Sequence, residues 1–380
     1  MSAIATVPNP DLAIVGDNKQ RWNHPNHRRH GFHNLHAIGR YGLTLRAASV
    51  MTLDNDWDLR IAEMSEVRRL TSLPWFSGMV VLRGQHVLYE TYAPDFGPAQ
   101  PHSIQSIGKM TMNLIVGPLV DRGLIDLAKP VGHYLPEIGS GYAAATVQQV
   151  LNMDVVNDYT EDFDDIRSTY FDHEEAMGFR LPRNPAREET MRGYLCRIAS
   201  RDTTNRSGHT QYKDPNTEVA GWIAERVSGR PLRAYLADIV DAAGIEGTYY
   251  TTTDREGVPV IAGGATLTAR DLARFGSLFV RRGRGVDGSQ AGSASFIEGT
   301  LKGGVTVAPP RSWLRYHNQC NTNGRWLGHG GYGGQYMLCD LTSGVVAVYY
   351  SVMEDRSGYV QSFYPPLIRM LEAVAALDPA

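Results

Sequence analysis

Ser106 and Lys109 stand three residues apart in the stretch Ser106-Ile107-Gly108-Lys109. On a helix, residues i and i+3 share a face, so the lysine amine can reach the serine hydroxyl. A serine needs a neighbour that accepts its proton before it can attack a carbonyl, and a partly desolvated lysine can be that base. If Ser106 begins a helix, its backbone N–H also points at the oxyanion formed during acyl transfer. The pair predicts a serine nucleophile, Ser106, with Lys109 as its base.

A two-position pattern of this kind arises by chance about once in a chain this long, so companion residues must decide. Tyr212 lies in Gln211-Tyr212-Lys213-Asp214, just before a helix that we expect from about Asn216. A phenol beside Lys109 could relay the proton from the nucleophile to the leaving group. Taken alone, Tyr212 is more simply a half-buried tyrosine whose hydroxyl lies at the surface.

The second companion is the glycine-rich stretch Leu327-Gly328-His329-Gly330-Gly331-Tyr332-Gly333-Gly334-Gln335. Such glycine density lets a substrate lie close against a strand edge. The backbone N–H of Tyr332 would then be the second oxyanion donor, beside that of Ser106. A glycine-rich bend of a strand is the alternative interpretation.

In this order, Ser106-x-x-Lys109, Tyr212 and His329-Gly330-Gly331 resemble the SxxK, YxN and KTG motifs of the serine β-lactamase and penicillin-recognising superfamily. A histidine at the lysine position of the third motif is typical of the branch resembling class C β-lactamases, which includes esterases and amidases. The similarity is greatest to 6-aminohexanoate-dimer (nylon-oligomer) hydrolases. It extends over about residues 75–352, with agreement in order and spacing.

The resemblance implies Ser106 as nucleophile, Lys109 as base and Tyr212 as proton relay. It also implies that Tyr159 is a substrate-contacting hydroxyl that assists the leaving amine. The other residues expected to bind substrate are those of the second and third motifs, Asp214, His329, Gly330 and Gly331.

Two positions depart from the family pattern. Asp214 stands where β-lactamases carry asparagine, and His329 replaces the lysine of the third motif. Both changes weaken the case for binding a β-lactam carboxylate, so they move the expected substrate away from β-lactams.

The elements that must position these residues divide the chain in three. Strand-like sequence occurs at both ends, with hairpins expected in residues 76–92 and 334–352, and helical periodicity fills the middle. We therefore expect an α/β (α+β) fold of the β-lactamase and transpeptidase type: an antiparallel sheet flanked by helices, with an inserted helical lobe. Residues 1–104 and 245–380 would form the sheet domain and residues 105–244 the mainly helical domain, with the active site between them.

Composition excludes several classes of protein. The net charge of −3 over 380 residues provides no basic field for a nucleic-acid partner. The three cysteines form no CxxC pair, which favours a reducing compartment over a disulfide framework. Residues 1–16 lack the pattern of a secretory signal, and the apolar runs are too short to span a bilayer. We expect a soluble, cytoplasmic protein without a membrane partner.

Two further clusters have weaker interpretations. Five acidic residues surround Tyr159 and are expected in a solvated loop, although one of them could hold a cationic amine of the substrate: Asp158, Glu161, Asp162, Asp164 and Asp165. Five histidines recur at every third position and are expected to make surface hydrogen bonds rather than to bind a metal: His24, His27, His30, His33 and His36.

These observations predict a serine hydrolase that cleaves an amide of a small molecule through an acyl-enzyme, without metal or cofactor. The same machinery used as an esterase or transacylase remains an alternative, as does a catalytically silent binding protein. A peptidoglycan carboxypeptidase is disfavoured because no export signal or anchor is evident. The oligomeric state stays open, with a homodimer as one option.

Overall fold

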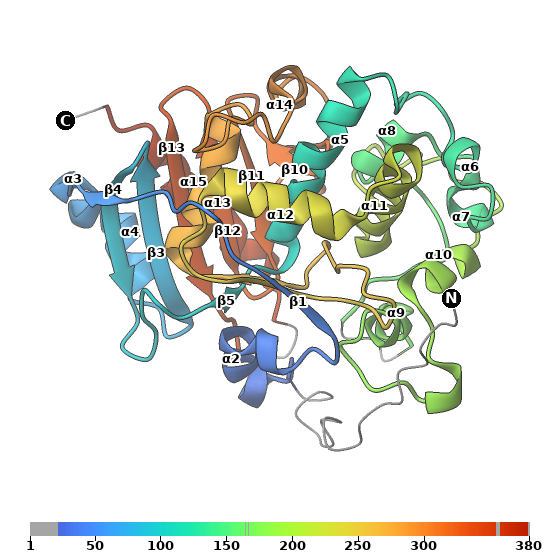
Figure 1. Cartoon of the computed structure of the whole chain (residues 1–380). Helices are drawn as coiled ribbons and strands as arrows, with labels where there is room; N and C mark the ends of the chain where they lie inside the picture. The colour runs from blue at the N-terminus through green and yellow to red at the C-terminus, as the bar shows by residue number, and fades with distance from the viewer. Residues whose placement is uncertain (1–21, 164, 166, 355–357, 379–380) are drawn as a thin grey trace.

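The structure is a computed structural model that describes residues 22–163, 165, 167–354 and 358–378. Its largest element is a sheet whose strands come from both ends of the chain: β2 (Asp54–Asn55), β3 (Phe76–Arg83), β4 (His86–Tyr92), β8 (Val305–Thr306), β9 (Arg315–His317), β10 (Cys320–Thr322), β11 (Trp326–Gly331), β12 (Gln335–Asp340) and β13 (Val345–Ser351). The spatial order is β2-β4-β3-β13-β12-β11-β10-β9-β8. Every pair is antiparallel except β2 with β4. Figure 1 shows the N-terminal strands beside the C-terminal ones.

The two predicted hairpins are confirmed. β3 and β4 are joined through Gly84, and β12 and β13 through Gly344; both glycines have positive φ, at 61° and 71°. Alternate residues of each central strand enter different cores, because successive side chains point to opposite faces of a sheet. On β3, Val80 packs into one core and Val81 into the other. A strand covered on both faces is apolar throughout, which explains the unbroken hydrophobic runs in the sequence.

Helices cover both faces of this sheet. On one face lies α13 (Ala269–Val280), whose Leu272, Phe275 and Phe279 share a core with Val346 and Val348 of β13. On the other face lie α4 (Ser65–Thr71) and α15 (Tyr364–Ala375), which pack against the opposite sides of the same strands.

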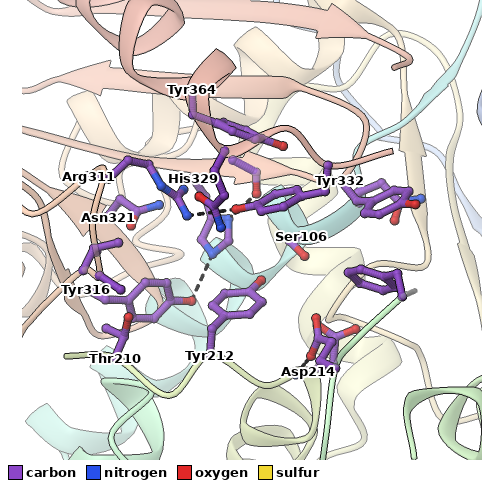
Figure 2. Close-up of a pocket in the computed structure, with 18 of the residues that line it drawn as sticks. Ser106, Thr210, Tyr212, Asp214, Arg311, Tyr316, Asn321, His329, Tyr332 and Tyr364 are labelled. Carbon is purple, nitrogen blue, oxygen red and sulfur yellow. Dashed lines mark hydrogen bonds between the residues drawn. The ribbon is translucent and has the colours of Figure 1, made fainter. Parts of the chain in front are cut away.

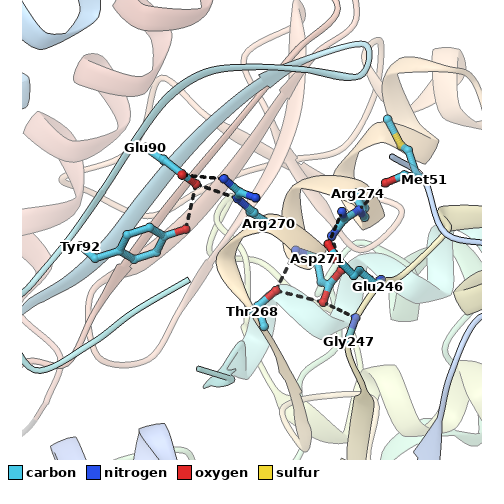
Figure 3. Close-up of polar contacts among 9 residues, drawn as sticks. All are labelled: Met51, Glu90, Tyr92, Glu246, Gly247, Thr268, Arg270, Asp271 and Arg274. Atoms are coloured by element: carbon cyan, nitrogen blue, oxygen red, sulfur yellow. Dashed lines mark hydrogen bonds and ion pairs between the residues drawn. The ribbon is translucent and has the colours of Figure 1, made fainter. Parts of the chain in front are cut away.

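Polar contacts at the start of α13 attach it to neighbouring segments (Figure 3). Thr268 caps the helix by accepting a hydrogen bond from Asp271 N at 3.1 Å. The Asp271 carboxylate accepts a hydrogen bond from the N–H of Gly247 at 3.0 Å. Arg270 donates two hydrogen bonds to Glu90 of β4, at 2.8 and 2.6 Å. These bonds fix the helix against the sheet.

The middle of the chain is mainly helical, as expected. It contains α5 (Thr111–Asp121), α6 (Val131–Tyr134), α7 (Ser140–Ala143), α8 (Val147–Leu151), α9 (Tyr170–Ala176), η4 (Pro185–Arg187), α10 (Met191–Arg197), α11 (Asp214–Ser228) and α12 (Leu232–Ala243). Figure 1 shows α6–α11 gathered at the opposite end of the molecule from β3 and β4. One detail differs from expectation: a 3-10 helix, η3 (Gln105–Met110), precedes α5, so Ser106 and Lys109 lie on a tighter turn than an α-helix.

A second, small sheet joins segments far apart in the sequence. Its strands, in spatial order, are β1 (Gly42–Leu45), β6 (Tyr249–Thr252), β7 (Ala265–Leu267) and β5 (His102–Ser103). Because β5 leads directly into η3, this sheet fixes the approach to Ser106. The remaining elements are α2 (Pro25–His33), η2 (Leu35–Ala37), α3 (Leu59–Glu63), α14 (Ala294–Thr300) and η5 (Gln361–Phe363).

Residues 1–21 lie outside the described residues, whereas the run from His24 to His36 is described. His33 is buried, with Nε2 3.2 Å from Ser77 Oγ, so the expectation of a surface side chain was wrong at this position. In the described part of the chain, no three His, Cys, Asp or Glu side chains are grouped so as to hold a metal ion. None of the helices in the described ranges combines the length and the apolar character that crossing a membrane requires.

Candidate active site

Ser106 is half-exposed in the first turn of η3, directly after a residue with unusual backbone geometry. Gln105 has φ 47°, in the left-handed region that costs a non-glycine residue free energy. Its side chain is fixed by donating to Ser103 Oγ at 2.6 Å. On the next turn, a Cβ at Gly108 would lie 2.6 Å from the carbonyl oxygen of Ile261, so glycine allows η3 to approach that segment. Strain and close packing therefore set the orientation of Ser106.

Lys109 is completely buried, and its amine contacts three groups. Nζ lies 2.9 Å from Ser106 Oγ, 2.5 Å from Asp214 Oδ1 and 2.7 Å from the carbonyl oxygen of Ala262. The carboxylate and the carbonyl can only accept hydrogen bonds, whereas the serine hydroxyl can also donate. A neutral amine that keeps its two N–H bonds to Asp214 and Ala262 therefore directs its lone pair at Ser106. This geometry suits proton transfer from the serine.

Asp214 is the first residue of α11 and forms a buried ion pair with Lys109. Its backbone N–H donates to Glu161 Oε2 at 3.0 Å. Burial, together with the neighbouring charge of Asp214, raises the pKa of Glu161 well above its ordinary value. The protonated form of Glu161 is thus favoured next to the carboxylate of Asp214, because two carboxylates this close disfavour a second negative charge.

The carbonyl group that contacts Lys109 is fixed by a second buried acid. The backbone N–H of Ala262 donates to Glu218 Oε1 at 3.0 Å, and Glu218 is 4% exposed on α11. Burial raises the pKa of Glu218 to about 8, so its neutral form is stable around neutral pH. The same helix therefore fixes two of the three contacts of Lys109.

Tyr212 reaches the site on the segment that leads into α11. The neighbouring Gln211 N–H donates to the carbonyl oxygen of Met153 at 2.7 Å, and Met153 itself has φ 54°. Nζ of Lys109 lies 5.0 Å from the centroid of the Tyr212 ring. Within the described residues, the Tyr212 hydroxyl is buried and has no hydrogen-bond partner. Burial raises the pKa of Tyr212 well above its usual value, although the nearby Ser106 hydroxyl acts in the opposite direction. Tyr212 is therefore a neutral phenol whose hydroxyl is available to a ligand.

His329 is 2% exposed on β11 and lies between two fixed partners. Its Nδ1 is 2.6 Å from the carbonyl oxygen of Gly330, and its Nε2 is 3.0 Å from the Tyr316 hydroxyl. Burial and the charge of Lys109 lower the pKa of His329 to about 3, so the ring is neutral. Since Gly330 O can only accept, Nδ1 carries the proton and Nε2 accepts from Tyr316.

The glycines after His329 bring the end of β11 against the strand that precedes Ser106. A Cβ at Gly331 would lie 2.8 Å from the carbonyl oxygen of Ile104, two residues before Ser106. Gly333 and Gly334 have φ 93° and 92°, which glycine adopts at little cost in the turn after Tyr332. Gln335 Nε2 donates to the Tyr332 carbonyl oxygen at 2.9 Å and so stabilises this turn.

These groups border one cavity of about 530 Å³ (Figure 2). Six of the residues predicted for the site line it: Ser106, Tyr212, Asp214, His329, Gly330 and Tyr332. Lys109 lies beneath Ser106, and Gly331 serves as the close contact with Ile104 rather than as a lining residue. The structure therefore brings the three sequence motifs together around one space.

Tyr159 is the exception, and the expectation that it contacts substrate requires correction. Its side chain is 3% exposed, and its hydroxyl lies 3.3 Å from His173 Nδ1. It does not line the cavity, whereas the nearby Phe163 and Tyr170 do. The expectation came from the resemblance to the family, but packing against His173 and Tyr194 directs this ring into the helical core.

The acidic cluster around Tyr159 is divided by the fold. Glu161 and Asp162 line the cavity, so the prediction of a wholly solvated loop was wrong for these two. Asp158 accepts a hydrogen bond from Ala199 N at 2.8 Å, and Asp165 pairs with its neighbour Arg167. One member, Asp164, lies outside the described residues.

Comparison with known proteins shows the family of the chain. The model of the Beta-lactamase family matches residues 70–358, well over half of the chain. A 6-aminohexanoate-dimer hydrolase of Paenarthrobacter ureafaciens is 33% identical over 289 residues, which cover 73% of this chain and 72% of the relative. The chain belongs to the Beta-lactamase family. The resemblance predicted from the motifs is confirmed, and the chain is a hydrolase of this fold.

Solved structures of Beta-lactamase type confirm the predicted fold class. A protein of Bacillus anthracis that is provisionally named a 6-aminohexanoate-dimer hydrolase superposes with a TM-score of 0.80 at 20% identity, over 97% of this chain and 98% of that one. A penicillin-binding protein homologue of Caulobacter crescentus superposes with a TM-score of 0.59 at 18% identity, over 83% and 97%. At sequence identities this low, the similarity shows a shared fold alone.

Several residues at the Beta-lactamase-type site were not predicted. Ala262 was missed because its backbone carbonyl carries the role, although Gly263-Gly264 beside it is the composition expected where backbones approach closely. Glu218 and Tyr316 had no signal, since each lies within an ordinary helix or strand pattern. Arg311 follows the pair Pro309-Pro310, where the sequence suggests only a turn.

Proposed function

We propose that this hydrolase cleaves a linear amide of a small molecule through an acyl-enzyme on Ser106. The observation that carries the proposal is the 2.9 Å contact between Lys109 Nζ and Ser106 Oγ at the floor of an open cavity. A serine next to an amine base, opening onto a cavity of this size, is the arrangement expected for nucleophilic acyl transfer.

In the first step Ser106 Oγ attacks the carbonyl carbon, and its proton passes to the lone pair of Lys109. The ammonium that forms keeps its contact with the Asp214 carboxylate, at 2.5 Å in the free enzyme. An opposite charge this close stabilises the ammonium as it develops, and burial strengthens the attraction. Asp214 therefore assists the base where the family motif has a neutral asparagine.

The oxyanion formed in this step is held by the backbone N–H groups of Ser106 and Tyr332. Support for this pairing comes from Gly331, whose close approach to the Ile104 carbonyl brings the end of β11 next to the segment carrying Ser106. The rigid turn through Gly333 and Gly334 sets the direction of the Tyr332 N–H. Preorganised donors of this kind lower the barrier because they need no reorientation during the reaction.

Collapse of the intermediate breaks the C–N bond, and the leaving amine takes a proton from the Tyr212 hydroxyl. Lys109 returns the proton that it took from Ser106 to Tyr212. The raised pKa of Tyr212 suits this role, because the phenol stays protonated until the amine accepts its proton. Water then attacks the ester carbonyl, its proton goes to Lys109, and the acid leaves as Ser106 recovers its hydroxyl hydrogen.

The substrate class rests on two features. The similar Paenarthrobacter ureafaciens protein is named for the hydrolysis of an amide dimer. In addition, His329 and Asp214 occupy the positions of the lysine and asparagine of the β-lactamase motifs. Both favour a linear amide over a β-lactam.

Two measurements test this function. A fluorophosphonate probe should label the wild-type protein and fail to label Ser106→Ala, while hydrolysis of linear amides, including short ω-amino-acid oligomers, should be lost in the same variant. A folded wild-type protein that takes no label and hydrolyses none of these amides would favour the alternative of a silent binding protein. Matched ester and amide substrates, with hydroxylamine as a competing acceptor, separate amidase from esterase and transacylase activity.

A further inference from the structure

Arg311 lies on the segment between β8 and β9 and lines the same cavity as Ser106. It is the only lysine or arginine among the described residues that line this cavity. Figure 2 shows its guanidinium group beside His329 and Asn321, with Asp214 on the other side of Ser106 in this view. The charge of Arg311 also contributes to lowering the pKa of His329, which places the guanidinium within electrostatic reach of the centre of the site.

The groups around Arg311 hold it in place without balancing its charge. Nη2 donates to the Tyr359 hydroxyl at 2.8 Å, and the guanidinium carbon lies 5.2 Å from the centroid of the Tyr364 ring. Nε is buried and, within the described residues, has no hydrogen-bond partner. Its electrostatic neighbours are the phenols of Tyr359, Tyr364 and Tyr336 rather than carboxylates. Arg311 is therefore a fixed cation with unused donor capacity.

A buried arginine elsewhere in the chain shows the usual arrangement. Arg274 is 2% exposed and donates to the carboxylates of Asp271 and Glu246, at 2.7 and 2.6 Å. A buried cation is costly unless an anion pairs with it. Among the described residues Arg311 has no such carboxylate partner, and it faces a cavity. An anionic group of a bound molecule could therefore compensate its charge.

We propose that Arg311 is a binding site for an anionic group of the substrate, a carboxylate above all. The planar fork of a guanidinium matches the two oxygens of a carboxylate, and the stacking on Tyr364 reduces the entropy lost on binding. With Asp214 and Glu161 bordering the other side, the cavity offers one cationic and one acidic end. That the amide bond to be cleaved lies between these two ends rests on the proposed function. Binding of an anion at Arg311 does not depend on it.

The test measures binding in a background without turnover. A series of N-acetyl-ω-amino acids of increasing chain length, and the corresponding primary amides, would be titrated calorimetrically into the Ser106→Ala variant. Each pair differs only in carboxylate against carboxamide. We expect at least one acid to bind about tenfold or more tightly than its amide, the effect typical of a charge-assisted hydrogen bond.

Substitutions then assign the preference to Arg311. In Ser106→Ala/Arg311→Gln the preference for the acid should disappear while the affinity for the amide changes less than about twofold, and Arg311→Lys should keep part of it. The matched control is Arg369→Gln, which removes the same charge from an exposed arginine that contacts Trp313 outside the cavity. It should leave the preference intact.

Equal weakening of acid and amide in Arg311→Gln, or no preference for any acid in Ser106→Ala, would overturn the proposal. Failure of the proposed function would be seen in a different experiment. The wild-type protein, with Arg311 intact, would then take no label on Ser106 and hydrolyse no substrate. A preference for acids together with absent turnover would keep the anion site and reject the hydrolase mechanism on Ser106.

Discussion

The cavity has two basic side chains in or beneath its wall, and the protein treats them in opposite ways. At the Lys109 end, the amine is fully buried, and its three contacts, Ser106, Asp214 and Ala262, all belong to the protein. At the Arg311 end, the guanidinium has tyrosine side chains around it, and its Nε has no hydrogen-bond partner among the described residues. An amine whose contacts all come from the protein is suited to moving a proton, whereas a guanidinium without a carboxylate partner in the described part of the chain is suited to binding an anion. We therefore expect the reaction at the Lys109 end of the cavity and substrate binding at the Arg311 end.

Three carboxyl groups lie at the Lys109 end of the cavity. Asp214, Glu161 and Glu218 all lie near Lys109, but the pKa values of Glu161 and Glu218 are raised, so these two favour their neutral forms. Asp214 is then the carboxyl group of the three that can stabilise the ammonium formed on Lys109 during the reaction. The other two can be buried at lower cost because their neutral forms carry no charge.

The largest effect is expected from Lys109→Met, which removes the base but keeps most of the buried volume. Without a proton acceptor for Ser106, kcat/KM should fall about 10³-fold or more. Hydrolysis rates check this outcome, and thermal unfolding checks that the variant is folded. Loss of less than tenfold in a folded variant would show that the Lys109 end does not perform the chemistry.

Tyr212→Phe should have the next largest effect. It removes only a hydroxyl that has no partner among the described residues, so stability should change little. Loss of general acid catalysis is expected to lower kcat about 10²- to 10³-fold for amides. Activated esters, whose leaving groups need no proton, should be affected far less. An equal loss on amides and activated esters would contradict the role as proton relay.

Glu218→Gln tests the support of the Lys109 end through the pH dependence of stability. The pKa of Glu218 is raised from 4.5 to about 8, so the folded protein keeps a proton that the unfolded chain has lost. This contribution is present below about pH 4.5 and is lost as the pH rises toward about 8, at up to about 1.4 kcal/mol for each pH unit. Glutamine keeps the acceptor for Ala262 N–H and does not titrate. The wild-type free energy of unfolding should therefore fall relative to the variant between pH 5 and pH 8, and parallel denaturation profiles would contradict this.

Asp214→Asn should have the smallest effect of the four and restores the residue typical of the family. Loss of the carboxylate should lower kcat/KM about tenfold, because the ammonium formed in the transition state loses its counter-charge. Hydrolysis rates of the folded variant check this outcome. An unchanged kcat/KM would show that Asp214 acts only in packing.

Much of the fold followed from local patterns. The hairpins around Gly84 and Gly344 were predicted because strand alternation and turn residues act over short distances. The 3-10 geometry of η3 was not predicted. It depends on Gln105 being held at positive φ by contacts from β5 and on the close approach of Gly108 to Ile261, which lie beyond local sequence.

The candidate site likewise contains residues that the sequence indicated and one that it misplaced. Ser106, Lys109, Tyr212 and His329 were found because their types and spacing form motifs whose order survives in sequence. Tyr159 was misplaced because its role was taken from the family resemblance, and the sequence does not show whether a tyrosine faces the cavity or the core. Packing against His173 decides that question, and packing is a property of three dimensions.

The sequence by itself indicated the candidate pair Ser106 and Lys109, the family and the order of strands and helices, since spacing and periodicity encode them directly. The tertiary structure alone decided which charges are compensated. Lys109 meets Asp214 across 105 residues and Ala262 across 153, whereas Arg311 meets only neutral partners among the described residues. Electrostatic compensation depends on distances through space and on burial, and a linear pattern of charges carries neither.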